Sequence, residues 1–344
     1  MPFWIFKGKK DDNEIRERQE AAVKALENGD IPPLARKRLE EQRDAGHKFF
    51  SSTLTTNEYL LAREAGYEPI GQVMGSSFMR VGFGNFRNSL TNSWMTPYST
   101  ELTDVTYSYR QARLLAVERL KKEAQILGAH GVIGVHIKVK ELDWSGNVTE
   151  FTAMGTAIKV PANSELQHVG DGPFTSSLSG QEFWQLYQAG YWPLGLVMGN
   201  CTYYSVADWA TRSVTGGAFF NGSWINQELT QFTQGFSQAR ELAVTRLTNE
   251  IANLGADGAV DMNINYHIIP VHFERNNTRY MNMVFDFIAI GTAVTKHPDL
   301  RSRGANKPLM MIDLKRGGRR DIEFDEPIYD MAQGGFEDED DDDD

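Results

Sequence analysis

The sequence predicts an α+β protein built from two copies of one strand–helix–strand–strand unit. Three observations carry this prediction: an internal repeat, an apolar stripe with helical period in each copy, and a strand-period alternation after each stripe. The chain has 344 residues, which is enough for two domains. Its single cysteine, Cys201, excludes a disulfide within the chain and a zinc site built on several cysteines.

The internal repeat consists of four blocks that occur in the same order in both halves. The two longest blocks match at eight of eleven and at eight of ten positions. The offset between the copies grows from 124 to 127 to 136 residues, so the second copy carries insertions between its blocks. A period of this length indicates duplicated domains rather than a solenoid. The matched blocks are 65–75 with 189–199, 111–120 with 238–247, 127–131 with 254–258, and 155–158 with 291–294.

Two charged helices are expected before the first copy, over residues 14–27 and 33–44, with Pro33 in the first turn of the second helix. The alternative for this segment is docking of "FWIFKGKK" (3–10) on a membrane surface or a partner. The N-terminus is not expected to be a signal peptide, because its charges follow the apolar part. No apolar run approaches the ~20 residues that a membrane-spanning helix needs.

Each copy begins with a strand, expected at 69–74 and at 193–198, and continues with a helix. Apolar residues recur at steps of three and four through this helix, while charged residues such as Arg113 fall off the stripe. Gly128 and Gly255 stand where a left-handed C-terminal cap belongs. The stripe consists of Val105, Tyr109, Ala112, Ala116, Leu120, Ala124 and Leu127 in the first copy, and of Phe236, Ala239, Ala243, Leu247 and Leu254 in the second.

The segment after each helix alternates as a strand does, and His136 belongs to its outward residues. A turn at 143–147 leads into the last strand, and Pro270 predicts a bulge or a sheet edge in the second copy. On a regular strand His267 and His272 would fall on opposite faces, and a bulge at Pro270 would change that. The inward residues are expected to be Ile133, Val135, Ile137 and Val139 in the first copy, and Val260, Met262, Ile264 and Tyr266 in the second.

Three strands with one helix make a thin unit, because one face of the sheet and its edges stay uncovered. This favours self-association, copy against copy or chain against chain. The segments between the first strand and the helix, 76–103 and 200–230, are rich in aromatic residues. We expect these aromatic residues to pack on their own sheet or between subunits, and a ligand pocket or partner groove is the alternative.

These ordered blocks resemble the YbjQ family, which is also called UPF0145 and carries a heavy-metal-binding label. The resemblance rests on the "G-x-V-x-G" strand, the "A-R-x-x-A" helix, the "L-G-A-x-G" turn and the closing "G-T-A" strand, and it covers about residues 51–160 and 175–297. It implies a two-layer, dodecin-like β-α-β-β fold with an antiparallel sheet whose third strand lies between the first two. It also implies a ring, commonly a homopentamer.

Metal binding is the sharpest chemical hypothesis, with His130 and His136 as candidate ligands. Neither residue belongs to the paired His or Cys spacing of a structural zinc site. The second copy has Asp257 and Asn263 at these places, so the ligand set is not kept between the copies. Solvated or interface histidines are the simpler interpretation, and a metal site formed only across a ring of subunits is the alternative.

No motif for catalysis or cofactor binding is found: Cys201 stands alone, and no phosphate-binding loop occurs. We therefore expect no catalytic residues, no cofactor and no enzymatic activity.

The net charge is −11, and residues 337–344 carry eight of the negative charges, which leaves −3 for the rest. A nearly neutral body argues against nucleic-acid binding. The acidic run is typical of a disordered extension, and docking to a basic partner is the alternative.

These observations divide the chain into five segments. The predicted function is a cytoplasmic, non-enzymatic scaffold or binding assembly that forms a homo-oligomeric ring of five chains. The alternatives are a heavy-metal or small-ligand binding protein with sites at subunit interfaces, and a membrane-peripheral scaffold. The segments are an N-terminal helical segment (1–50), a first YbjQ-like domain (51–162), a linker (163–174), a second YbjQ-like domain (175–297) and a C-terminal extension with the acidic tail (298–344).

Overall fold

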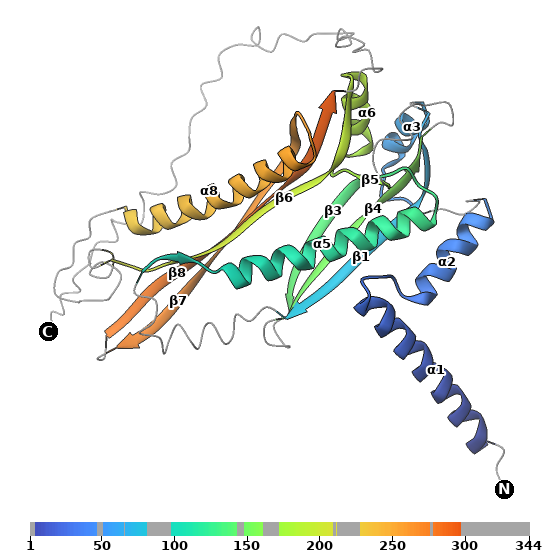
Figure 1. The fold of residues 1–344 in the computed structure, drawn as a ribbon, viewed down its shortest axis with the longest axis horizontal. Coiled ribbons are helices and arrows are strands. Elements are labelled where there is room, and N and C mark those ends of the chain that lie inside the picture. The colour runs from blue at the N-terminus through green and yellow to red at the C-terminus, as the bar shows by residue number, and fades with distance from the viewer. Residues whose placement is uncertain are drawn as a thin grey trace, which may run out of the picture. The chain divides into compact units, whose positions relative to one another are not determined.

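A computed structural model describes residues 4–46, 51–64, 66–80, 98–142, 148–160, 172–208, 211, 228–275 and 278–296. The acidic tail, the turn at 143–147 and most of the two aromatic segments lie outside these residues. The chain is an α+β protein with two four-stranded sheets, the first mixed and the second antiparallel (Figure 1). None of the described helices is long and apolar enough to cross a membrane. The elements are α1 (Trp4–Glu27), α2 (Pro33–Asp44), α3 (Thr56–Glu64), β1 (Glu68–Arg80), β2 (Thr100–Glu101), α5 (Thr103–Ile126), β3 (Gly131–Leu142), β4 (Val148–Lys159), β5 (Phe174–Thr175), α6 (Gly180–Gln188), β6 (Tyr191–Ser205), α8 (Thr230–Asn253), β7 (Gly258–Arg275) and β8 (Thr278–Lys296).

The first sheet has the order β1-β4-β3-β5, and the second has the order β2-β6-β8-β7. In both sheets the three long strands are antiparallel, and the last of them in sequence lies in the middle. Each sheet also gains one short strand at an edge: β5 pairs parallel with β3, and β2 pairs antiparallel with β6. Because β2 directly precedes α5, the start of this helix is tied to the second sheet.

The strand registers of the two sheets correspond residue by residue. In the first sheet Met74 pairs with Met154, which pairs with His136. In the second sheet Met198 pairs with Ile290, which pairs with Asn263. These positions are related by the offsets of 124, 136 and 127 residues found in the sequence. Equivalent positions of the two halves can therefore be compared directly.

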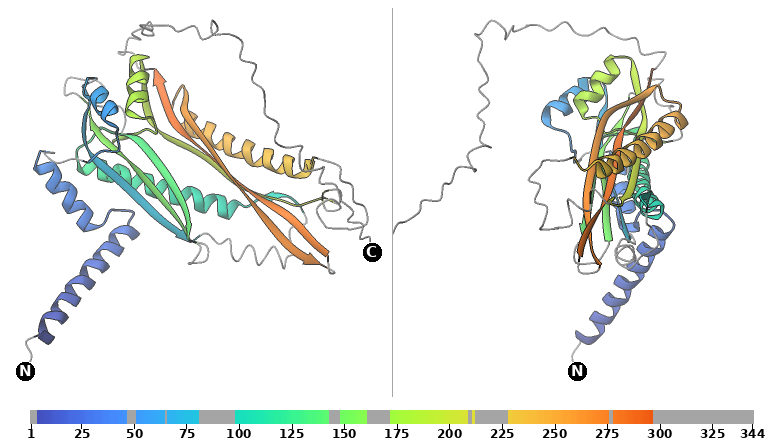
Figure 2. Two further views of the ribbon diagram at one scale, coloured as in Figure 1. Left: turned by 180° about the vertical axis from the view of Figure 1, so that it is seen from behind. Right: turned by 90° about the vertical axis from the view of Figure 1, so that its left-hand side faces the viewer.

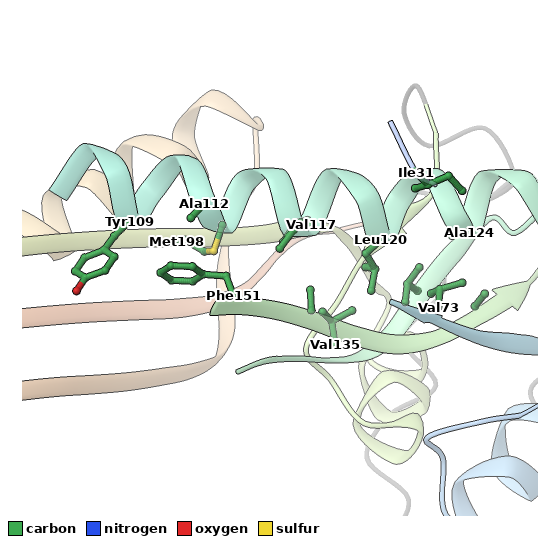
Figure 3. Packing of buried hydrophobic residues seen from close by; sticks show 14 of the residues in the cluster. Ile31, Val73, Tyr109, Ala112, Val117, Leu120, Ala124, Val135, Phe151 and Met198 are labelled. Atoms are coloured by element: carbon green, nitrogen blue, oxygen red, sulfur yellow. The ribbon is translucent and has the colours of Figure 1, made fainter. Parts of the chain in front are cut away.

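Each long helix packs against its sheet where the strand carries a glycine. A Cβ atom on Gly75 would overlap the carbonyl oxygen of Ala116 in α5, and one on Gly199 would overlap that of Ala243 in α8. The backbones of helix and strand therefore touch without intervening side chains, as only glycine permits. The helix residues above the sheet, Ala112, Ala116, Leu120 and Ala124, are fully buried, as the apolar stripe predicts (Figure 3).

A glutamate carboxylate ties each helix to the edge of the same strand. The backbone N–H of Met74 donates to Glu123 Oε2 at 2.9 Å, and that of Met198 donates to Glu250 Oε2 at 2.9 Å. Strand β1 is an edge strand, and β6 pairs with β2 only at Tyr203 and Tyr204. The N–H groups of Met74 and Met198 therefore receive from a side chain the acceptor that a neighbouring strand would provide. Burial raises the pKa of Glu123, while the N–H of Met74 and the charge of Arg38 oppose the rise.

A short helix precedes the first strand of each half, and the sequence analysis did not predict it. Helix α6 begins with a capping box, in which Ser179 and Glu182 bond each other's backbone N–H groups. Thr55 and Glu58 make the same reciprocal pair at α3. Helices α3 and α6 lie side by side (Figure 2), and the rings of Tyr67 and Phe183 meet edge to face between them, 4.9 Å apart.

The alternation predicted for the strand after each long helix is broken by a bulge, so one part of that prediction is wrong. The register shifts between Ile133 and His136, where Gly134 adopts a φ of +61°. As a result Ile133 packs in a different cluster from Val135, on the side of Trp192. The second half repeats the bulge with Asp261 at a φ of +52°. Pro270 causes no second bulge, since the register continues through it on the edge strand β7.

In the second half, Val260 packs on the side of Trp192 as Ile133 does, and the other residues predicted to face inward stay uncovered. Tyr266 contacts the ring of Phe236 in α8 at 5.1 Å, which places it on the helix side of the sheet. It is nevertheless exposed, because β7 extends past the width that α8 covers. Met262, Ile264 and Ile268 are exposed in the same way. This correction matters for function, because an exposed apolar row on an edge strand is typical of an interaction surface.

The N-terminal helices are present at 4–27 and 33–44, the first starting ten residues earlier than predicted. Leu39 of α2 is fully buried in the cluster formed around α5. Gln42 donates to the carbonyl of Ile70 at 3.0 Å, and Arg38 lies 3.7 Å from Glu123. Helix α2 therefore packs as part of the first half of the molecule.

We predict that Gly75→Ala destabilises the protein by about 1–3 kcal/mol, because the added methyl group would push α5 away from β1. Gly258→Ala is the matched control, since nothing lies within 4 Å of a Cβ atom there. Urea denaturation followed by circular dichroism measures the difference. Equal unfolding midpoints for the two variants would contradict the close helix–strand contact.

Candidate functional site

His130, the first predicted metal ligand, caps the end of β4. Its Nδ1 accepts the backbone N–H of Val160 at 2.9 Å. In the second half, Asp257 Oδ2 accepts the backbone N–H of Lys296, the residue equivalent to Val160, at 2.7 Å. Histidine and aspartate thus do the same structural work in the two halves. The bond also engages Nδ1, one of the two nitrogens through which His130 would bind a metal.

His136, the second predicted ligand, lies on the face of the first sheet that points away from α5. We call this face the outer face, formed by Met74, Ser76, Phe78, His136, Lys138, Glu150, Thr152 and Met154. The structure does not bring His130 and His136 together into a metal centre: within the described ranges, no group of three or more His, Cys, Asp or Glu residues could hold a metal ion. Two methionines do share the cross-strand row of His136, since Met154 pairs with both His136 and Met74.

Cys201 lies in the core between the second sheet and α8. Burial, together with the charge of Glu101, raises the pKa of its thiol to about 12, although Arg246 opposes the rise. A thiol with such a pKa is almost wholly protonated at neutral pH, and only the thiolate is a strong nucleophile. Its environment fits the small buried hydrophobe that the sequence analysis favoured.

Strand β6 of the second sheet is covered on both faces, whereas its counterpart β1 in the first sheet has one open face. One face packs on α8 through Gly199 and Cys201. The other face packs on the N-terminal half of α5: Asn200 Nδ2 donates to the carbonyl of Thr106 at 2.9 Å, and the N–H of Thr202 donates to Thr106 Oγ1 at 2.9 Å. Helix α5 is therefore sandwiched between the two sheets, with Met198 of β6 beside Tyr109 and Phe151 (Figure 3).

Arg113 is the most buried charge in this α5 contact, although the sequence predicts it off the buried stripe. Its guanidinium lies 5.9 Å from the ring centre of Tyr109 and 5.5 Å from that of Phe151. Burial lowers the pKa of Arg113, and the carboxylate of Asp286 on β8 opposes this shift. Asp286 itself accepts a hydrogen bond from Thr202 at 2.9 Å. An arginine on α5 thus faces an acid on the second sheet.

Two ion pairs border the same contact. Arg246 of α8 lies 2.7 Å from Glu101 of β2, and it also donates to the carbonyl of Asn200 at 2.8 Å. Burial raises the pKa of Glu101, but the hydrogen bonds and the charge of Arg246 outweigh it, so that pKa is lowered overall. Arg110 of α5 pairs with Glu250 of α8. Both pairs connect residues that are more than 130 positions apart in sequence.

Residues equivalent to those in this contact stay open elsewhere on the molecule. Met198 is 6% exposed under α5, whereas Met74 on the outer face is 47% exposed. Val117 of α5 is 7% exposed, whereas Val244, its counterpart on α8, is 36% exposed. Thr233 and Arg240 of α8 are exposed as well, although their counterparts Thr106 and Arg113 are buried.

A cavity of about 420 Å³ opens beside the start of α8. Its counterpart in the first half is filled, because Leu102, Val105 and Tyr109 share a buried cluster with Val271 and Val284 of the second sheet. The lining is almost wholly apolar, which makes it a surface for another apolar face. The cavity is lined by Leu229, Phe232, Thr233, Phe236, Tyr266, Ile268, Met283 and Phe285.

Comparison with known proteins places the chain in a family. A family model described as "Putative heavy-metal-binding", the YbjQ model, matches residues 54–161. An encapsulin nanocompartment protein of Mycobacterium tuberculosis is 32% identical over 272 residues, which cover 79% of this chain and 94% of the relative. A UPF0145 protein of Clostridium kluyveri is 37% identical over 93 residues, which cover 27% of this chain and 77% of the relative. The chain belongs to the YbjQ family. No solved structure matches it.

Sequence reasoning missed the charged residues that lie in the α5 contact of this YbjQ-family chain, and their counterparts in the other half. Arg113 and Arg240 stand in the repeated "QAR" block, and that identity was a usable signal. An arginine that recurs beside the apolar stripe in both copies can belong to a second packing face of the helix, in addition to the face that covers its own sheet. Glu150 and Asp286 are acids at equivalent positions, but the sequences around them differ enough to hide the correspondence.

We predict that His130→Asp leaves the stability of the YbjQ-family chain unchanged, because aspartate already caps the equivalent strand in the second half. His130→Ala removes the acceptor of the Val160 N–H and should cost about 1 kcal/mol. Urea denaturation of the three proteins measures both effects. If His130→Asp is as destabilising as His130→Ala, the capping role is wrong.

Proposed function

We propose that the protein is a non-enzymatic, self-assembling scaffold whose chains each contribute two YbjQ-like units, residues 51–162 and 175–297. The observation that carries the proposal is the difference between the two sheets. Strand β6 of the second sheet has both faces covered inside the chain, while the first sheet and α8 keep open the equivalents of the covered residues. An apolar face left open in this way favours association with a further copy.

The similarity to an encapsulin nanocompartment protein supports a role within a larger assembly. That relative aligns over most of both chains, so the similarity includes both proposed units. We further propose a closed ring of five chains in the cytoplasm, following the family resemblance. The acidic tail of the C-terminal extension (298–344) is proposed to bind a basic partner.

We expect the purified full-length chain to form one discrete oligomer at micromolar concentration. Light scattering coupled to size exclusion should give a whole multiple of the 38.8 kDa chain mass, with five chains for the proposed ring. The tail-free chain 1–297 is the control, because the open surfaces lie outside the tail. A monomer of 38.8 kDa would contradict the proposed function.

A second candidate function is binding of a soft metal ion on the outer face. The observation that favours it is the cross-strand row of Met74, Met154 and His136. Directly opposed residues have Cβ atoms about 4.5–5.5 Å apart, so two thioethers and one imidazole lie side by side. Thioether ligands select Cu(I) over the harder cations. The equivalent row in the second sheet is Met198, Ile290 and Asn263, so each chain would hold one such site.

We predict that Cu(I) binds the chain and that the variant Met74→Leu/Met154→Leu abolishes this binding, because leucine keeps the volume and removes the sulfur. Titration with a colorimetric Cu(I) competitor under reducing conditions measures the affinity. His130→Asp is the matched control and should bind as the unmodified chain does. Equal binding by the double variant would rule out the row.

A further inference from the structure

Helix α8 and the outer face of the first sheet carry the two halves of a contact that the chain already contains. Inside the chain, that contact joins α5 to the second sheet. Its helix side includes Thr106, Arg113 and Val117, and the same three residue types recur on α8. The recurring residues are Thr233, Arg240 and Val244, all exposed.

The apolar parts of the two open surfaces match. On the sheet side, Met74 takes the place of Met198, and Phe78, which is 60% exposed, takes that of Thr202. On the helix side, the cavity lined by Phe232 and Phe236 takes the place of the filled region around Val105 and Tyr109. A methionine and a phenylalanine on one surface thus face an apolar cavity on the other, as in the core of an interface.

The charges match as well. Within the chain, Arg113 of α5 lies near Asp286 of the second sheet. The equivalent of Arg113 is Arg240 on α8, and the equivalent of Asp286 is Glu150 on the outer face, which pairs with Phe78 as Asp286 pairs with Thr202. The equivalent residues carry the same charges, so Arg240 of α8 would lie opposite the acidic Glu150 as Arg113 of α5 lies near Asp286.

A second charge pair repeats in the opposite direction. Within the chain, Glu101 before α5 pairs with Arg246. The equivalent of Glu101 is the exposed Glu228 before α8, and the equivalent of Arg246 is Arg119. Arg119 repeats the bond of Arg246 to a strand carbonyl, donating to the carbonyl of Ser76 at 2.6 Å. It also donates to the carbonyl of Leu26, where Arg246 pairs with a carboxylate. The positive charge of Arg119 is therefore complementary to the negative charge of Glu228.

We propose that the N-terminal half of α8 in one chain docks on the outer face of the first sheet in the next chain, with Arg240 opposite Glu150 and Glu228 opposite Arg119. The proposal rests on the proposed function, since it names the surfaces through which the chains assemble. The occupant is a second copy of this chain, because the two surfaces repeat the residue types, the charges and the strand register of an existing contact.

The two surfaces of one chain cannot meet each other. Helix α5 covers one face of the first sheet, and the outer face lies on the opposite side. Helix α8 covers the face of the second sheet that α5 does not contact. The order is therefore outer face, first sheet, α5, second sheet and α8, so the open surfaces end the stack on opposite sides. Such a head-to-tail contact joins one chain to the next and produces a ring when the rotation closes.

Charge reversal tests the named interface. Glu150→Arg and Arg240→Glu alone should each weaken association at least about 30-fold, because each places like charges opposite one another. The double variant Glu150→Arg/Arg240→Glu should restore the oligomer. Lys37→Glu on the exposed surface of α2 is the control and should leave the mass unchanged. Light scattering over a dilution series measures all four proteins beside the unmodified chain.

Cross-linking identifies the occupant. The variant Glu150→Cys/Arg240→Cys, treated with a short bismaleimide, should give a ladder of linked chains on a denaturing gel, while buried Cys201 contributes no background. An oligomer that survives both single charge reversals and gives no ladder would overturn this interface but leave the proposed function standing. A monomeric unmodified chain would overturn both. A cross-link confined to single chains would show that the surfaces meet within one molecule, which also overturns the proposal.

Discussion

The packing of α5 against two sheets at once is the constraint on which the rest of the structure depends. On one side the helix backbone touches β1 at Gly75, which requires a stripe of small residues such as Ala112 and Ala116. On the other side it buries Thr106 and Arg113 against the second sheet. Because one helix packs on both sheets, the two halves of the described chain share part of their buried core.

The elements that a periodic apolar pattern produces could be predicted from the sequence. The apolar stripe of α5 and the glycines that follow the long helices reflect local geometry, and the structure places them as predicted. The bulge at Gly134 could not be read from alternation, because a single residue in the left-handed region moves Ile133 to the other face. The two short helices had a readable signal, the capping box of Ser179 and Glu182.

The candidate site was harder to predict than the fold, since it depends on contacts between the halves. Arg113 looks like a solvent-facing residue on a helix wheel, but it is buried over Phe151 of the first sheet and near Asp286 of the second. The His130–Asp257 exchange looked like loss of a ligand, whereas the structure shows two side chains that accept the same backbone N–H. Comparing the halves residue by residue distinguishes such structural substitutions from surface differences.

The glutamates that the two long helices share, Glu123 and Glu250, have different arginine partners, and this difference distinguishes the two units. Glu250 pairs with Arg110 of α5, but Glu123 lies near Arg38 of α2, a helix without a counterpart among the described residues of the second half. Two nearly equivalent units could otherwise be joined out of phase, first unit to first unit. Because α2 packs beside Glu123 of the first unit, the two units differ chemically at this position. The two units therefore present different charged surfaces to any molecule that meets them.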